Sequence, residues 1–177
     1  MERNRMRGTR ALTLSAVLSA LGVVLLTLGS LVQVLDLTMA VLASFFVIFA
    51  VIEMGGKYPY LVYAVTALLA MLLCPQKTAA LVYLCFAGYY PIIKAALERY
   101  LPRLWAWVIK ILIFNAGLAV ALLLAIKLFA TFTVPATWYY FLLPLLTPVF
   151  VLYDIALSRV ITAYLLKWRQ RFTFLHK

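Results

Sequence analysis

The sequence is poor in the residues from which most active sites are built. Its 177 residues include one histidine, two cysteines, seven glycines and five acidic residues. His176 is next to the last residue, so we expect no buried imidazole to serve as a base or a ligand. Cys74 and Cys85 lack the spacing of a metal or redox motif, and the scattered glycines form no phosphate loop. We therefore expect no catalytic residue, no metal, no cofactor and no enzymatic activity.

Charged residues are also scarce. They make up 12% of the chain, whereas 67% of the residues are hydrophobic, and a soluble domain carries roughly 25% charged residues. This balance predicts an all-α integral membrane protein with one domain over residues 1–177. The net charge of +11 does not predict nucleic-acid binding, because the basic residues flank apolar segments. They suit contact with anionic membrane lipid.

Hydrophobic runs predict six transmembrane helices. A helix needs roughly 20 residues to cross the bilayer untilted, so the second and third spans are short and the sixth is long. The first is longer than the apolar core of a signal peptide and has no clear cleavage site, so we expect it to be retained. The predicted spans are residues 11–35, 37–54, 60–74, 78–97, 104–129 and 138–166.

The positive charges are distributed unevenly between the two sides of this six-span arrangement. Lys110 and Arg159 lie within apolar segments, and only Lys77 and Lys127 fall on one side. Because cytoplasmic loops retain Lys and Arg during insertion, both termini are predicted to be cytoplasmic, in a bacterial plasma membrane. The remaining basic residues share that side: Arg3, Arg5, Arg7, Arg10, Lys57, Lys94, Arg99, Arg103, Lys167, Arg169, Arg171 and Lys177.

The first span carries small residues in two rows. Small side chains let membrane helices approach closely, so each row predicts a helix contact, either within this bundle or with another subunit. Ala16 and Ala20 form the shorter row. The longer row is Ala11, Ser15, Ser19, Gly22 and Gly29.

Charged residues inside the spans are expected to be paired, because an isolated charge in hydrocarbon is costly. We predict that Lys110 and Asp154 pair across helices near the cytoplasmic side, as a structural clasp. We also predict that Glu53 pairs with Lys94 or Arg159.

The outer half offers aromatic, hydroxyl and amide groups with little charge. Such groups are typical of a pocket for a small, flat, weakly polar ligand. Packing at proline kinks and an interfacial aromatic belt are the alternatives. The candidate substrate-binding residues are Asp36, Gln76, Tyr83, Asn115, Trp138, Tyr139 and Tyr140.

The segment SAVLSALG in the first span places Ala16 and Ala20 in an Ala-x-x-x-Ala pattern. With the chain's size, its six spans and its short second and third spans, this pattern resembles the substrate-binding S component of energy-coupling-factor (ECF) vitamin transporters. The resemblance implies a transmembrane coupling subunit and two ATPases as partners, an outward-facing ligand pocket and transport by tilting. Two other classes stay open: a small scaffold of the cell-shape or division machinery, and a stand-alone small-solute transporter.

The charge asymmetry makes the orientation testable. Tags at Met1 and Lys177 should both be cytoplasmic, and a cysteine replacing Lys77 should react with an impermeant thiol reagent added to intact cells. The Cys74→Ser, Cys85→Ser background is the control for labelling of the native thiols. Reaction of the new cysteine only after lysis would contradict this topology.

Overall fold

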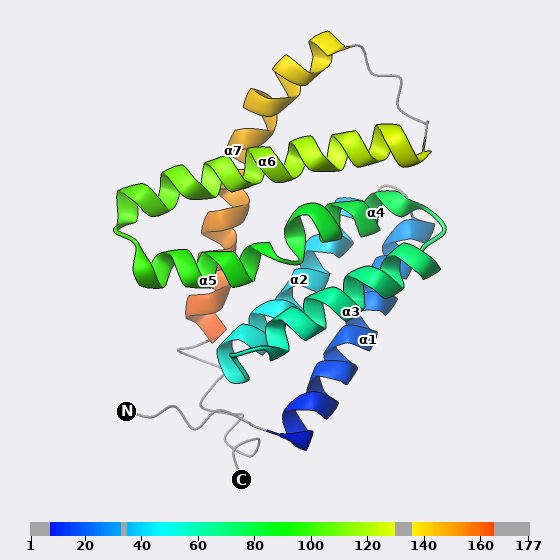
Figure 1. Cartoon of the computed structure of the whole chain (residues 1–177), viewed down its shortest axis with the longest axis vertical. Coiled ribbons are helices and arrows are strands. Elements are labelled where there is room, and N and C mark those ends of the chain that lie inside the picture. Colours follow the sequence, from blue (N-terminus) through cyan, green and yellow to red (C-terminus); the bar gives the residue numbers. More distant parts are fainter. Residues whose placement is uncertain (1–7, 33–34, 130–135, 165–177) are drawn as a thin grey trace.

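The protein folds as a bundle of helices (Figure 1). The computed structural model describes residues 8–32, 35–129 and 136–164, without the side chains of 103, 125–129 and 136–144. Every regular element in these ranges is helical, which confirms the all-α prediction. The elements are α1 Thr9–Leu31, α2 Asp36–Glu53, α3 Tyr58–Leu73, α4 Lys77–Val82, a π-helical turn Tyr83–Ala87, α5 Tyr90–Tyr100, α6 Arg103–Phe129 and α7 Ala136–Ala163.

Each predicted span falls on one helix or one helical run. Five stretches within the described residues are long and apolar enough to cross a membrane: 9–31, 36–53, 77–100, 104–124 and 145–163. The sixth, α3, has 16 residues and a length of about 24 Å, against roughly 30 Å of hydrocarbon. The fold is therefore that of a helical membrane protein, while six complete spans and their orientation stay predictions.

The first three helices pack through small side chains. Ala40, Ala43 and Ala50 of α2 are completely buried. A Cβ atom at Gly22 of α1 would lie 3.0 Å from Cγ2 of Thr66 on α3. Small residues at such contacts let helix backbones approach closely, which is how membrane helices gain packing energy without a hydrophobic drive. The longer row of small residues on α1 thus serves packing inside the bundle.

The predicted fourth span is one helical run interrupted by a π-helical turn. The amide of Gly88 donates to the carbonyl of Tyr83 at 2.8 Å, five residues back. The Tyr63 hydroxyl of α3 donates to the carbonyl of Leu84 at 2.8 Å, which satisfies a group inside the widened turn. Pro91 follows in the first turn of α5, where its missing N–H is tolerated. The turn thus lets a proline lie within a continuous helical run.

The second part of the bundle is built around aromatic rings. Phe114 of α6 and Phe150 of α7 stack with centroids 4.6 Å apart, and Phe86 meets both rings edge to face. A Cβ atom at Gly117 of α6 would lie 2.7 Å from the carbonyl oxygen of Cys85, so α6 passes directly over the π-helical turn. Figure 1 shows α6 lying alongside the run from α4 to α5 and crossing α7 steeply.

The helices differ in how much of their surface the bundle covers. The hydrophobic window of the run 77–100 is 56% buried, whereas those of α6 and α7 are each 17% buried. The run 77–100 is therefore the central helix, and α6 and α7 present leucines and valines to their surroundings. The first turn of α1 and the last turn of α7 lie at the same lower end of the bundle in Figure 1.

Candidate functional site: a buried charge network between α5, α6 and α7

One face of α5 carries three polar side chains at four-residue intervals. Tyr90, Lys94 and Glu98 lie one helical turn apart and so project from the same side. Tyr90 and Lys94 are almost completely buried, while the Glu98 side chain is 47% exposed. The helix therefore presents a hydroxyl, an ammonium and a carboxylate in order from the interior to the surface.

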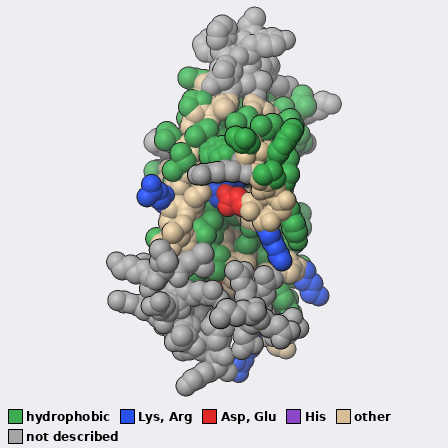
Figure 2. Space-filling view, turned by 90° about the vertical axis from the view of Figure 1, so that its left-hand side faces the viewer, with side chains coloured by type: hydrophobic (Ala, Val, Ile, Leu, Met, Phe, Trp, Pro, Cys, Tyr) green, Lys and Arg blue, Asp and Glu red, His purple; other side chains and the backbone are tan. Residues whose placement is uncertain are grey.

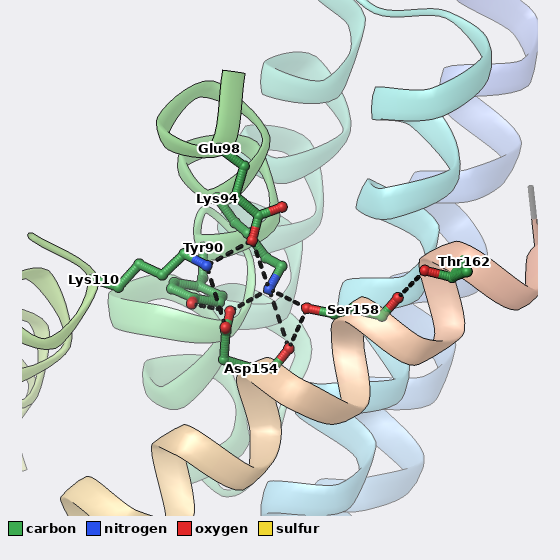
Figure 3. Close-up of polar contacts among 7 residues, drawn as sticks. All are labelled: Tyr90, Lys94, Glu98, Lys110, Asp154, Ser158 and Thr162. Carbon is green, nitrogen blue, oxygen red and sulfur yellow. Dashed lines mark hydrogen bonds and ion pairs between the residues drawn. The ribbon is translucent and has the colours of Figure 1, made fainter. Parts of the chain in front are cut away.

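Asp154 of α7 is the centre of the network (Figure 3). It is 2% exposed. Its Oδ1 accepts hydrogen bonds from the Tyr90 hydroxyl and from the Lys94 ammonium. Its Oδ2 lies 3.2 Å from Nζ of Lys110 on α6. Three helices thus converge on one carboxylate.

The Lys94 ammonium is held on several sides. Besides the Asp154 carboxylate, it reaches the backbone carbonyl of Asp154 at 3.1 Å and Oγ of Ser158 at 2.8 Å. The Ser158 hydroxyl in turn donates to that same carbonyl at 2.9 Å. An ammonium has three protons to donate, so Lys94 is fully satisfied and its position is well defined.

Glu98 closes the network from the surface side. Its Oε1 lies 3.2 Å from Nζ of Lys94 and 2.6 Å from Nζ of Lys110. The Lys110 ammonium also lies over the ring of Trp107, 5.3 Å from its centroid, a favourable cation–π distance. Two carboxylates and two ammoniums therefore balance, and the buried cluster has no net formal charge.

A cavity of about 290 Å³ opens beside this network. Figure 2 shows an acidic patch with basic side chains beside it and hydrophobic side chains above it. Asp154 is among the residues that line the cavity, so a ligand in the cavity would meet the network directly. The cavity is lined by Glu98, Leu101, Ala106, Trp107, Lys110, Asp154 and Ser158.

The structure contains the first predicted charge pair and overturns one alternative for the second, while the pairing of Glu53 with Arg159 stays a prediction. Lys110 and Asp154 contact each other as the sequence indicated. The predicted contact of Lys94 with Glu53 is wrong, because Lys94 turns to Asp154 and Glu98 instead. Glu53 accepts a hydrogen bond from the Tyr164 hydroxyl at 3.1 Å.

Two of the three polar residues on this face of α5, Tyr90 and Glu98, were not predicted from the sequence, and Lys94 was predicted with another partner. Tyr90, Lys94 and Glu98 belong to the segment YYPIIKAALE, in which their four-residue spacing is visible. That spacing places polar side chains on one face of an apolar helix, and such a face needs partners within the bundle. The spacing could have revealed the site, although it could not name Asp154 as its centre.

The predicted substrate residues do not line this cavity. Gln76 is exposed immediately before α4, and Tyr83 is completely buried in the π-helical turn. The Asn115 amide donates to the carbonyl of Ile111 at 2.8 Å, one turn back on α6. Asp36 begins α2. Trp138, Tyr139 and Tyr140 lie on α7, and their side chains are outside the described residues.

The two predicted docking residues lie on the outside of the bundle. Ala16 and Ala20 are exposed on α1, whereas Ser15 and Ser19 beside them are buried. Among the residues that the structure describes, no three His, Cys, Asp or Glu side chains are grouped as a metal site would require.

The chain matches no protein-family model, no curated protein and no solved structure. Its function must therefore be argued from its own residues.

The network predicts unequal effects of removing its charges. Asp154→Asn should destabilise the folded protein most, by about 3–5 kcal/mol, because it leaves two buried ammoniums with one half-exposed carboxylate. Lys110→Met should cost less, since Lys94 still compensates Asp154. Thermal unfolding in detergent measures both, and the double variant should lose less than the sum of the single losses.

The control is Arg159→Met, which removes an exposed charge five residues along the same helix. It should change the unfolding midpoint little. Additive losses for Lys110→Met and Asp154→Asn would show that the two side chains do not interact.

Proposed function

We propose that this chain is a membrane-embedded capture subunit of a bacterial importer of small, vitamin-like molecules. It binds its ligand in the outer half of the bundle and docks to a transmembrane coupling subunit that two ATPases drive. The observation that carries the proposal is a pair of buried polar atoms without hydrogen-bond partners.

These atoms are Oδ1 of Asp36 and the hydroxyl oxygen of Tyr83. Among the buried side-chain oxygen and nitrogen atoms of the described residues, these two oxygens are the ones that lack a hydrogen-bond partner. Both belong to residues that the sequence predicted to bind substrate. The Tyr83 hydroxyl lies near Thr66 without the geometry of a full hydrogen bond. Leaving a polar group buried and unpaired costs about 1–3 kcal/mol, and a ligand that supplies the partner removes that cost.

The surroundings of Tyr83 suit a flat, weakly polar ligand. Tyr63 lies next to Tyr83 with ring centroids 6.2 Å apart, and Tyr89 meets Tyr63 edge to face at the same separation. The π-helical turn carries Tyr83, and such turns are frequent at functional sites because they widen a helix locally. Aromatic faces with a free hydroxyl provide stacking and one orienting hydrogen bond.

The outer face of α1 supports the docking half of the proposal. Its small residues divide into a buried row, used inside the bundle, and the exposed pair Ala16 and Ala20. Exposed Leu12, Val17 and Val24 flank this pair. In a bilayer, an alanine pair among larger apolar side chains forms a shallow groove into which a partner helix can pack closely.

Tyr83→Phe tests the ligand site. Because the hydroxyl has no partner in the free protein, its removal should leave the unfolding midpoint unchanged or slightly higher. Retention of a copurified small molecule, measured by native mass spectrometry of gently extracted protein, should fall roughly tenfold, as for one lost hydrogen bond to a ligand.

Tyr63→Phe is the matched control, since its hydroxyl bonds the Leu84 carbonyl. It should lower stability by about 1 kcal/mol in the ligand-free protein. If no small molecule is retained by the wild type and cell-wall proteins copurify instead, the capture proposal fails and the scaffold alternative replaces it.

The docking face has its own test. Ala16→Leu with Ala20→Leu should abolish copurification of the coupling subunit and ATPases, because leucines hold the two helices apart. Ligand retention by the isolated chain should be unchanged. The matched control is Ala116→Leu with Ala119→Leu, two exposed alanines on α6, which should leave assembly intact. Loss of folding in the α1 variant would show instead that Ala16 and Ala20 pack within the bundle.

A further inference from the structure

One carboxylate beside the cavity, that of Glu98, is half-exposed and held less firmly than a purely structural clasp requires. Asp154 is buried and bound on both oxygens, whereas Glu98 reaches both lysines through Oε1 alone and is 47% exposed. The contacts of the half-exposed Glu98 contribute less to stability than those of Asp154, because water screens them. Glu98 is therefore the member of the network that can leave at the lowest cost.

The departure of Glu98 would change the charge of the site. Lys94, Lys110 and Asp154 would remain, with a net formal charge of +1 and the Lys110 ammonium facing the cavity. Ser158 lines the same cavity with a hydroxyl, and Trp107 with an apolar ring. This arrangement complements a singly charged anion with at least two oxygens, the charge and type of group that Glu98 itself supplies.

The position of the cavity indicates where such an anion comes from. Lys94 lies six residues before the end of α5, or roughly 9 Å along the helix, so a headgroup could approach it if this helix end meets the membrane surface. Hydrophobic side chains lie beside the acidic patch on the described part of this face (Figure 2). Exposed Leu104 and Trp105 lie at the start of α6 near this opening. A ligand with an apolar tail and a singly charged phosphate would meet this face directly.

We infer that the cavity between α5, α6 and α7 binds the phosphodiester group of an anionic phospholipid, which displaces Glu98 from Lys94 and Lys110. The phosphate oxygens take the place of Oε1 of Glu98 and accept from the Lys110 ammonium, which lines the cavity, while the acyl chains lie along the apolar sides of α6 and α7. The cavity of about 290 Å³ corresponds to about ten water volumes of roughly 30 Å³ each, enough for a headgroup. This site is separate from the ligand site at Tyr83 and goes beyond the proposed function.

The test places the full chain in nanodiscs made of phosphatidylcholine with about one tenth as much phosphatidylglycerol. At this low fraction, retention of phosphatidylglycerol reports preferential binding. Native mass spectrometry after release counts the retained lipid. We expect phosphatidylglycerol to be enriched over its bulk fraction. Glu98→Gln should raise that enrichment roughly twofold to threefold, because the competing carboxylate is gone. Lys110→Met should abolish it, and Lys110→Arg should restore it.

Two controls separate this site from other effects. Arg159→Gln removes an exposed charge from α7 and should leave enrichment unchanged, so a loss there would mean unspecific attraction and overturn the inference. Tyr83→Phe should also leave it unchanged, which keeps the result independent of the proposed function. Should Lys110→Met fail to fold, Glu98→Gln decides alone: equal enrichment in this variant and the wild type overturns the inference.

A competition experiment distinguishes a phosphodiester that belongs to a lipid from one that is free in solution. Soluble glycerophosphoglycerol, the same phosphodiester headgroup without acyl chains, should not displace phosphatidylglycerol at concentrations on the order of millimolar, because it lacks the apolar tail that α6 and α7 contact. Displacement by the soluble compound would support an anion site but overturn the lipid as its occupant.

Discussion

The carboxylate of Asp154 is the constraint around which the second half of this protein is arranged. A lone carboxylate in hydrocarbon is costly, so the helix that carries it requires cations from its neighbours. Lys94 of α5 and Lys110 of α6 supply them, and Tyr90 adds a hydroxyl. Because these partners come from different helices, satisfying one side chain fixes how α5, α6 and α7 meet. The stacked rings of Phe114 and Phe150 then fill the space beside the network.

The first half of the bundle is held together in another way. Helices α1, α2 and α3 contain buried alanines, serines and glycines at their contacts, so their backbones approach closely and dispersion replaces ionic attachment. The run 77–100 joins the two halves. Its first turns pack on α2 and contain the buried Ala79 and Ala80, and its last turns carry Lys94 and Glu98. The π-helical turn between them allows one helix to belong to both kinds of packing.

This division also separates the two proposed sites. Asp36 and Tyr83 carry the unpartnered oxygens on which the proposed ligand site rests. The second half holds a charge-balanced network whose surface member, Glu98, is half-exposed. A ligand site and a lipid site at opposite depths would let the protein stay anchored in one leaflet while it exchanges ligand at the other. Packing alone explains neither the missing partners of the first site nor the exposed carboxylate of the second.

The sequence by itself determined the all-α class and the approximate position of every helix, because long apolar runs and their interruptions are local properties. It also pointed to Lys110 and Asp154 as partners, since both are charges inside apolar segments. Only the tertiary structure decided that Lys94 joins Asp154 rather than Glu53, and that Ala16 and Ala20 face outward while Ser15 and Ser19 face inward. These outcomes depend on how each helix is rotated about its axis, and that rotation is set when faces from distant segments pack together, not by the spacing within any one of them.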